Sequence, residues 1–92
     1  MYRISFTNRF KKDMLRCQKR GMDITLVSTA IAILKEQGVL PSSYRPHKLT
    51  GDHAGQWECH LKPDWIMVWE HNELELQLLF LYTGTHSDIF KK

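Results

Sequence analysis

A five-residue apolar segment, "WIMVW" at residues 65–69, constrains the fold more strongly than any other part of this chain. Successive side chains of a β-strand point to opposite faces of the sheet. The two tryptophans and Met67 would therefore share one face, and Ile66 and Val68 would share the other. A strand that is apolar on both faces must be covered on both, which predicts a central position in a sheet.

Three other segments are predicted to be strands of the same sheet. The segments "YRISFT" (2–7) and "QWECHL" (56–61) alternate in polarity, and "ELELQLLFLYT" (73–83) is long and rich in β-forming residues. His71 and Asn72 should form the tight turn between the last two strands, because Asn tolerates a positive φ.

Two amphipathic helices are predicted between the first and second strands. The first covers residues 8–20, presents a basic outer face and ends at Gly21. The second runs from a capping residue, Asp23, to a terminating glycine, Gly38. The apolar stripes that define them are Phe6, Phe10, Met14 and Cys17 in the first helix, and Ile24, Val27, Ile31 and Leu34 in the second.

The remaining segments are a long loop and a short helical turn. Residues 38–55 contain several Gly and Pro residues and no sustained periodicity, and loops of that length in small domains are usually functional or disordered. Residues 85–92 should form a helical turn capped by Ser87. The order β-α-α-β-β-β favours an α+β fold, with one domain over residues 1–92, an antiparallel sheet and two helices packed on one of its faces.

Charge is distributed unevenly along the chain. Residues 1–50 carry ten Lys and Arg against three Asp and Glu, whereas residues 51–92 carry three against seven. The basic half is expected either to bind a polyanionic or acidic partner or to form solvated helix faces. The two cysteines, Cys17 and Cys59, are expected to be free thiols in a reducing cytoplasm. No apolar run approaches the roughly 20 residues of a membrane span, so no membrane partner is expected.

Four titratable residues are candidates for a shared site. His60 ends one predicted strand, Asp64 begins the next and His86 follows the last, so an antiparallel arrangement would bring them to one end of the sheet. His47 lies in the long loop. Histidine donates or accepts a proton near neutral pH. RNA cleavage needs a base for the 2′-OH, an acid for the leaving 5′-oxygen and a cation for the charged phosphate, and it requires no metal.

Less specific interpretations are open at this point. Asp64 could be an ordinary turn residue after Pro63, and the histidines could be scattered over the surface. A structural zinc site is disfavoured, because Cys59 and His60 are adjacent and adjacent strand residues point to opposite faces.

Three short motifs, in their order along the chain, resemble those of a known family. The segments "YRPHKLTG", "CHLKPDWIMVW" and "YTGTHSDIF", together with the predicted order of elements, resemble the YafQ branch of the RelE superfamily of bacterial toxins. The resemblance covers nearly the whole chain. It implies the toxin of a type II toxin–antitoxin module, an endoribonuclease that cleaves translated mRNA in the ribosomal A site without a metal or other cofactor.

The resemblance also implies roles for particular residues. The catalytic set would be His47, His60, Asp64 and His86, with substrate contacts from Phe90, Arg45, Lys48 and Lys62. We expect His86 to be the general acid and either Asp64 or His60 to be the base. Family members often carry a basic residue just before "TGTH", where this chain has Tyr82. Arg45, Lys48 or Lys62 would then have to supply the cation.

Several partners follow from the same resemblance. An antitoxin would wrap the toxin, and operator DNA would be bound only through that complex. The basic helices would face ribosomal RNA while the site engages mRNA. The alternative function is a binding protein of the same fold without catalysis, which would occupy the ribosome or another target such as gyrase.

Overall fold

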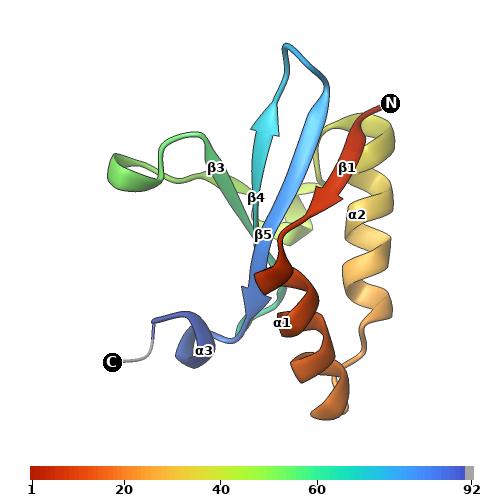
Figure 1. The fold of residues 1–92 in the computed structure, drawn as a ribbon, viewed down its shortest axis with the longest axis vertical. Coiled ribbons are helices and arrows are strands. Elements are labelled where there is room, and N and C mark those ends of the chain that lie inside the picture. Colours follow the sequence, from red (N-terminus) through yellow and green to blue (C-terminus); the bar gives the residue numbers. More distant parts are fainter. Residues whose placement is uncertain (91–92) are drawn as a thin grey trace.

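The computed structural model describes residues 1–90, except for the side chain of Phe90. Figure 1 shows two long helices beside a twisted sheet, with a short helix near the C-terminus. The strands are β1 (Arg3–Phe6), β2 (His47–Lys48), β3 (Gln56–Lys62), β4 (Trp65–Asn72) and β5 (Gln77–Gly84). The helices are α1 (Asn8–Lys19), α2 (Thr25–Gln37) and α3 (His86–Phe90), with short 3-10 turns at Ser42–Tyr44 and Gly51–His53.

The central position predicted for the apolar strand is confirmed. The strand order is β1-β5-β4-β3-β2, so β4 has two strands on each side. Neighbouring strands from β2 to β5 are antiparallel, whereas β1 pairs with β5 in parallel. The parallel pair arises because the chain passes through the helices and three strands before β5 returns beside β1. The expected α+β class is therefore confirmed, with one parallel pair in a mostly antiparallel sheet.

Both long helices contribute to one hydrophobic core on one face of the sheet. Side chains from the two helices and from three strands form this cluster: Phe10, Cys17, Val27, Ala30, Leu34, Cys59, Trp65, Met67, Trp69, Leu78 and Phe80. Ile66 and Val68 point to the other face and are also fully buried. Burial of the strand on both faces is what the apolar segment required.

Helix α1 runs along the part of β5 that β1 does not cover. β1 pairs with β5 only as far as Phe80. Beyond it, the Thr7 hydroxyl donates to the Leu81 carbonyl at 2.7 Å. The Thr83 N–H donates to Oδ2 of Asp13 at 3.1 Å, and Arg16 donates to the Thr83 carbonyl at 3.2 Å. Side chains of α1 thus satisfy backbone groups that an open sheet edge would leave unpaired.

The helix boundaries follow local chemistry. The Thr7 hydroxyl accepts the Phe10 N–H at 2.9 Å and caps α1. Gly38 ends α2 in a left-handed conformation with φ 74°, as its sequence position predicted. The carboxylate of Asp23 accepts the Thr25 N–H at 3.1 Å, although the residue at the cap position itself is Ile24. Both cysteines are buried free thiols, as expected.

Three local predictions are wrong. His71 and Asn72 belong to β4, and the turn is formed by residues 73–76, where the Asn72 side chain accepts the Glu75 N–H at 3.0 Å. The long loop contains a short strand, β2, which extends the sheet beside β3. The cap of α3 is Thr85 and not Ser87, because the Thr85 hydroxyl accepts the Asp88 N–H at 3.1 Å. In each case a side chain or a strand partner that periodicity does not reveal decided the local structure.

Candidate active site

The face of the sheet opposite the helices carries the candidate site. Directly opposed residues of antiparallel strands point to the same face. His47 pairs with Glu58, and Glu58 pairs with Val68. Val68 in turn pairs with Tyr82, so these four side chains form one row across β2 to β5. His60 lies two residues beyond Glu58 and points to the same face. We call this surface the histidine face.

Three histidines from separate segments come together on the histidine face. The ring centroids of His47 and His60 are 6.5 Å apart. Those of His60 and His86 are 6.0 Å apart. The three segments that supply them are β2, β3 and the start of α3. An arrangement of scattered surface histidines would not place three rings at this spacing, which suits groups that act on one phosphate.

Asp64 lies beside the three histidines and contacts His86. Nδ1 of His86 lies 2.6 Å from Oδ1 of Asp64, and the backbone N–H of His86 donates to the same oxygen at 3.2 Å. The hydrogen bond from His86 lowers the pKa of the Asp64 carboxyl below its ordinary value. Asp64 follows Pro63 in the turn between β3 and β4, so the turn places it opposite the end of β5.

His47 is held at the other end of the group of three histidines. Nε2 of His47 lies 3.1 Å from Oε1 of Glu58, and Nδ1 lies 3.2 Å from the backbone oxygen of Arg45. Both neighbours are hydrogen-bond acceptors, so a ring protonated on both nitrogens satisfies both. Arg45 has a φ of 49°, which non-glycine residues adopt infrequently. This turn brings its carbonyl to the histidine.

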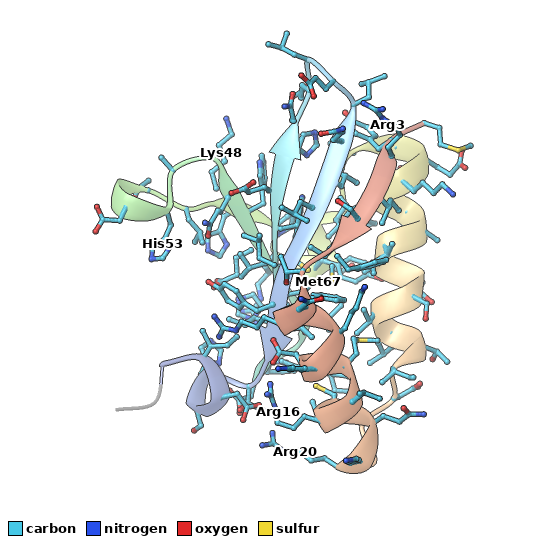
Figure 2. The ribbon with its side chains drawn as sticks, in the orientation of Figure 1. Arg3, Arg16, Arg20, Lys48, His53 and Met67 are labelled. Atoms are coloured by element: carbon cyan, nitrogen blue, oxygen red, sulfur yellow. The ribbon has the colours of Figure 1, made fainter. Side chains whose placement is uncertain are left out.

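Helix α3 is fixed to α1 by its aspartate. The Asp88 carboxylate accepts the Thr85 N–H at 3.0 Å, while Arg20 donates to both its oxygens at 2.8 and 2.9 Å. These bonds hold the pKa of Asp88 well below its usual range, with the Arg20 hydrogen bond as the largest cause. Figure 2 shows Arg16 on α1 and Arg20, the residue that follows the helix, at the same end of the molecule as α3. His86 opens α3, so the Arg20–Asp88 contact positions the segment that carries it.

The predicted substrate-binding cations have different surroundings. Lys48 lies with its ammonium 5.8 Å from the Trp57 ring, and Trp57 stacks on Trp69 on the core side of the sheet. Lys62 lines a hollow together with Asp64. Arg45 meets His47 through its backbone oxygen. The prediction for Phe90 concerns a side chain outside the described residues.

Two residues of the histidine face, Glu58 and Arg9, were not singled out in the sequence. Glu58 binds His47, and strand alternation from His60 could have identified it. The Arg9 guanidinium lies 4.3 Å from the Tyr82 ring centroid. Burial is the main cause that raises the pKa of Tyr82, so the phenol is neutral at physiological pH. No local pattern links Arg9 to Tyr82, because they are 73 positions apart in the chain.

The described residues also bear on metal, membrane and thiol chemistry. Among residues 1–90, no three His, Cys, Asp or Glu side chains are grouped as ligands for a metal ion. Within the same part of the chain, no helix is long and apolar enough to cross a membrane. Burial raises the pKa of the Cys59 thiol to about 12, so this cysteine is not a nucleophile.

Comparisons with known proteins agree with the predicted resemblance. A protein named mRNA interferase toxin YafQ from Escherichia coli strain K12 is 31% identical over 88 residues, which cover 95% of this chain and 94% of that protein. A structure described as the E. coli DinJ–YafQ complex matches with a TM-score of 0.89 and 30% identity, over 98% of this chain and 99% of that one. A metal-bound toxin from Helicobacter pylori matches with a TM-score of 0.88 and 32% identity, over 98% and 100% of the two chains.

The family model described as the bacterial toxin YafQ of type II toxin–antitoxin systems matches residues 2–91. The match therefore spans both the two-helix segment and every strand of the sheet. It also includes His47, His60, Asp64 and His86. The chain belongs to the YafQ family of bacterial toxins of type II toxin–antitoxin systems.

Proposed function

We propose that this protein is an endoribonuclease that cleaves mRNA during translation, using the 2′-OH of the substrate as nucleophile. The observation that carries the proposal is the row of three histidines, with centroids 6.5 and 6.0 Å apart and Asp64 bound to one end. The relatives named as mRNA interferases support the choice of substrate.

The proposed mechanism assigns two proton transfers to two histidines. His60 accepts the proton of the 2′-OH, and the oxygen attacks phosphorus. His86 donates a proton to the leaving 5′-oxygen as the P–O bond breaks. The products are a 2′,3′-cyclic phosphate and a 5′-OH, and water is not consumed in this step. Asp64 holds the His86 ring through Nδ1, which leaves the donation to Nε2.

Asp64 is better suited to positioning than to acting as the base. Its Oδ1 already accepts two hydrogen bonds from His86, at 2.6 and 3.2 Å. The lowered pKa of this carboxyl makes it a weaker base than an ordinary aspartate. His60 is therefore the base in our proposal, and His47 contacts the phosphate. Phe90 is proposed to position a substrate base by stacking.

We propose the ribosome as the setting of the reaction. The exposed basic side chains of α1 include Lys11, Lys12 and Lys19, which would face the phosphates of ribosomal RNA. Arg20 is partly committed to Asp88, so these lysines carry most of the free charge of the helix. The protein would act in the cytoplasm, where ribosomes translate mRNA.

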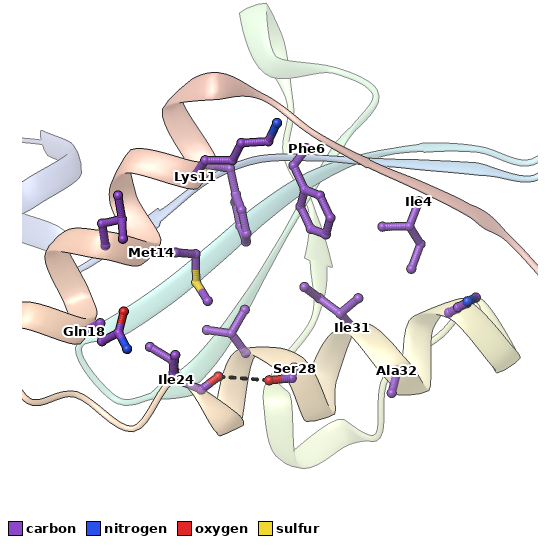
Figure 3. Close-up of a pocket in the computed structure, with 13 residues that line it drawn as sticks. Ile4, Phe6, Lys11, Met14, Gln18, Ile24, Ser28, Ile31 and Ala32 are labelled. Atoms are coloured by element: carbon purple, nitrogen blue, oxygen red, sulfur yellow. Dashed lines mark hydrogen bonds between the residues drawn. The ribbon is translucent and has the colours of Figure 1, made fainter.

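An antitoxin is proposed to occupy the groove between α1 and α2. The groove has a volume of about 840 Å³ and is lined mainly by apolar side chains, with Lys11 and Lys35 among its lining residues. Figure 3 shows Met14 and Ile31 directed into it from the two helices. Phe6 and Leu15, which both line the groove, are 41% and 57% exposed, so its apolar surface is open to a partner. An amphipathic segment with acidic flanks matches this combination of apolar floor and basic rim.

The antitoxin proposal also includes the operator. The chain itself is not proposed to bind operator DNA, which would be reached only through the toxin–antitoxin complex.

Co-expression of toxin and antitoxin from the native operon tests whether the antitoxin occupies the groove between α1 and α2. A Leu15→Glu variant should remain toxic but lose neutralisation, whereas an Arg3→Ala variant, altered at the far end of the molecule, should be neutralised normally. Normal neutralisation of Leu15→Glu would place the antitoxin elsewhere.

Mapping of 5′ ends of cellular mRNA after brief induction tests the endonuclease proposal. Cut sites should appear in translated regions with a three-nucleotide periodicity relative to the reading frame. They should be absent from untranslated RNA and absent with His86→Ala. Growth arrest without new 5′ ends would instead identify a binding protein of the same fold that occupies the ribosome or another target.

A further inference from the structure

Arg9 extends from α1 onto the histidine face. It lies in the first turns of α1, the helix that runs along the outer edge of β5. Its guanidinium carbon is 4.3 Å from the Tyr82 ring centroid. Tyr82 belongs to the same cross-strand row as Glu58 and His47. The Arg9 guanidinium is therefore placed at the β5 end of this cross-strand row, and His47 lies at its β2 end.

Two other arginines, Arg16 in α1 and Arg20 at its C-terminal cap, are held by hydrogen bonds within the protein. Arg16 donates to Asp13 at 2.9 Å and to the Thr83 carbonyl at 3.2 Å. Arg20 is bound to both carboxylate oxygens of Asp88. The nearest carboxylate oxygen to Arg9 is Oδ2 of Asp13, at 3.8 Å from Nε, and its side chain is 56% exposed. Arg9 is thus the α1 arginine whose guanidinium an incoming substrate can reach.

The aromatic ring and the carboxylate orient this guanidinium. A cation over the face of an aromatic ring is attracted by the ring's quadrupole. Tyr82 is half-buried and neutral, so its ring provides a fixed apolar platform instead of a competing anion. Asp13 is itself held by the Thr83 N–H and by Arg16, so the carboxylate that faces Nε has a fixed position. The planar guanidinium can present two parallel N–H groups to phosphate oxygens.

We propose that Arg9 is a catalytic residue that binds the scissile phosphate and stabilises the negative charge of its transition state. The proposal rests on the endoribonuclease function proposed above. It supplies the cation that the reaction needs, whereas the Lys48 ammonium lies 5.8 Å from the Trp57 ring. Tyr82 then becomes a positioning residue for Arg9, in the strand position where a basic side chain would itself reach the site.

Single-turnover cleavage of a defined mRNA by purified toxin on stalled ribosomes tests this proposal. At saturating toxin, Arg9→Ala should lower the cleavage rate about 10–100-fold, the scale for loss of one stabilising donor. Arg9→Lys should recover part of the rate, because it restores charge without the bidentate geometry. Arg3→Ala is the charge-matched control, because Arg3 lies in β1 far from Arg16 and Arg20 (Figure 2), and it should cleave like the wild type.

Relocating the charge gives a stricter test. The double variant Arg9→Ala, Tyr82→Arg should cleave faster than Arg9→Ala alone, because the new guanidinium starts from the strand position that Arg9 covers. Binding is measured separately on the same ribosomes with mRNA that carries a 2′-O-methyl group at the cleavage site. Arg9→Ala should weaken that binding much less than it lowers the rate.

The possible results separate this proposal from the previous one. Cleavage by Arg9→Ala at the wild-type rate would overturn the role of Arg9. A loss that appears entirely in binding of the 2′-O-methyl mRNA would also overturn it and make Arg9 a ribosome-binding residue. Failure of the wild type to cleave any ribosome-bound mRNA would overturn the endoribonuclease function itself. Circular dichroism and urea unfolding of each variant identify losses due to misfolding.

Discussion

Nδ1 of His86 and Oδ1 of Asp64 lie 2.6 Å apart, and the same carboxylate oxygen accepts the backbone N–H of His86. The pair joins the β3–β4 turn to the first residue of α3. Their side chains are 45% and 70% exposed, so the contact contributes little to stability. Its effect is geometric, because two hydrogen bonds from one residue to one oxygen fix the orientation of the imidazole.

This geometry predicts how variants of the pair behave in cleavage. His86→Ala should lower the single-turnover rate about 10²–10⁴-fold, the usual contribution of a general acid. Asp64→Asn should lower it about 10–100-fold, the scale of a group misplaced by about 1 Å. The double variant should be no slower than His86→Ala, because Asp64 acts through His86. Multiplicative losses would show that Asp64 has an independent catalytic role.

The pair also predicts a change in the titration of Asp64. The His86 hydrogen bond lowers the pKa of this carboxyl, so the ionised form persists as the pH falls through the ordinary aspartate value of about 3.9. His86→Ala should raise the pKa of Asp64 toward that ordinary value, while the backbone N–H of residue 86 still donates to the carboxylate. NMR detection of the side-chain carboxyl carbon measures it directly. An unchanged titration midpoint in the variant would mean that the 2.6 Å contact does not persist in solution.

Asp88 should stabilise the protein in a pH-dependent way. Asp88→Asn replaces the carboxylate that accepts from Arg20 and from the Thr85 N–H with a neutral amide, and should cost about 1–2 kcal/mol at pH 7. Because its folded-state pKa is depressed, this contribution is fully present above the unfolded-state value of about 4 and is lost progressively as the pH falls from there through the folded-state pKa. Urea unfolding at pH 7 and at pH 3 tests both parts.

Comparison of the unfolding free energies at pH 7 and pH 3 provides the control for the Asp88 prediction. The difference in unfolding free energy between wild type and Asp88→Asn should shrink at pH 3. A difference of the same size at both pH values would show that the carboxylate charge is not its source. The variant should also cleave more slowly at pH 7, because α3 carries His86.

The buried hydroxyl of Thr83 is expected to contribute strongly to the free energy of unfolding. Its oxygen accepts the Trp65 indole N–H at 3.0 Å and donates to the Ile66 carbonyl at 2.7 Å. Thr83→Val keeps the shape but leaves both partners unsatisfied, and should cost about 2–4 kcal/mol. Thr83→Ser keeps the hydroxyl and loses one methyl group, at a cost of about 1 kcal/mol. Denaturant unfolding should therefore rank Val as the more damaging change, and the reverse order would contradict this account.

Some parts of the fold could be predicted because they depend on short-range patterns. The unbroken apolar run at residues 65–69 predicted that β4 lies in the middle of the sheet, and Gly38 ended α2 where the helical pattern stopped. The parallel pairing of β1 with β5 could not be read in this way, because it depends on where two segments meet after the intervening chain has folded. The same reason explains the missed strand β2, whose two residues have no periodicity of their own.

The candidate site divides in the same manner. Turn chemistry at Pro63 and the ends of the strands indicated that His60, Asp64 and His86 would lie near one another. The sequence left open whether Asp64 is a base or an orienting residue, because that choice depends on a contact of 2.6 Å between residues 22 positions apart. Glu58 and Arg9 entered the site only when the strand pairs and the path of α1 were known.

By itself, the sequence determined the α+β class, the central strand, the two helices and membership in a toxin family, because each depends on local periodicity or on short motifs. Only the tertiary structure decided which charged groups reach the histidine face. Lys48 is close to the histidines in sequence but approaches Trp57, whereas Arg9 is distant in sequence but lies over Tyr82. The physical reason is that a side chain's face is set by strand register and helix placement, and both follow from packing across the whole core.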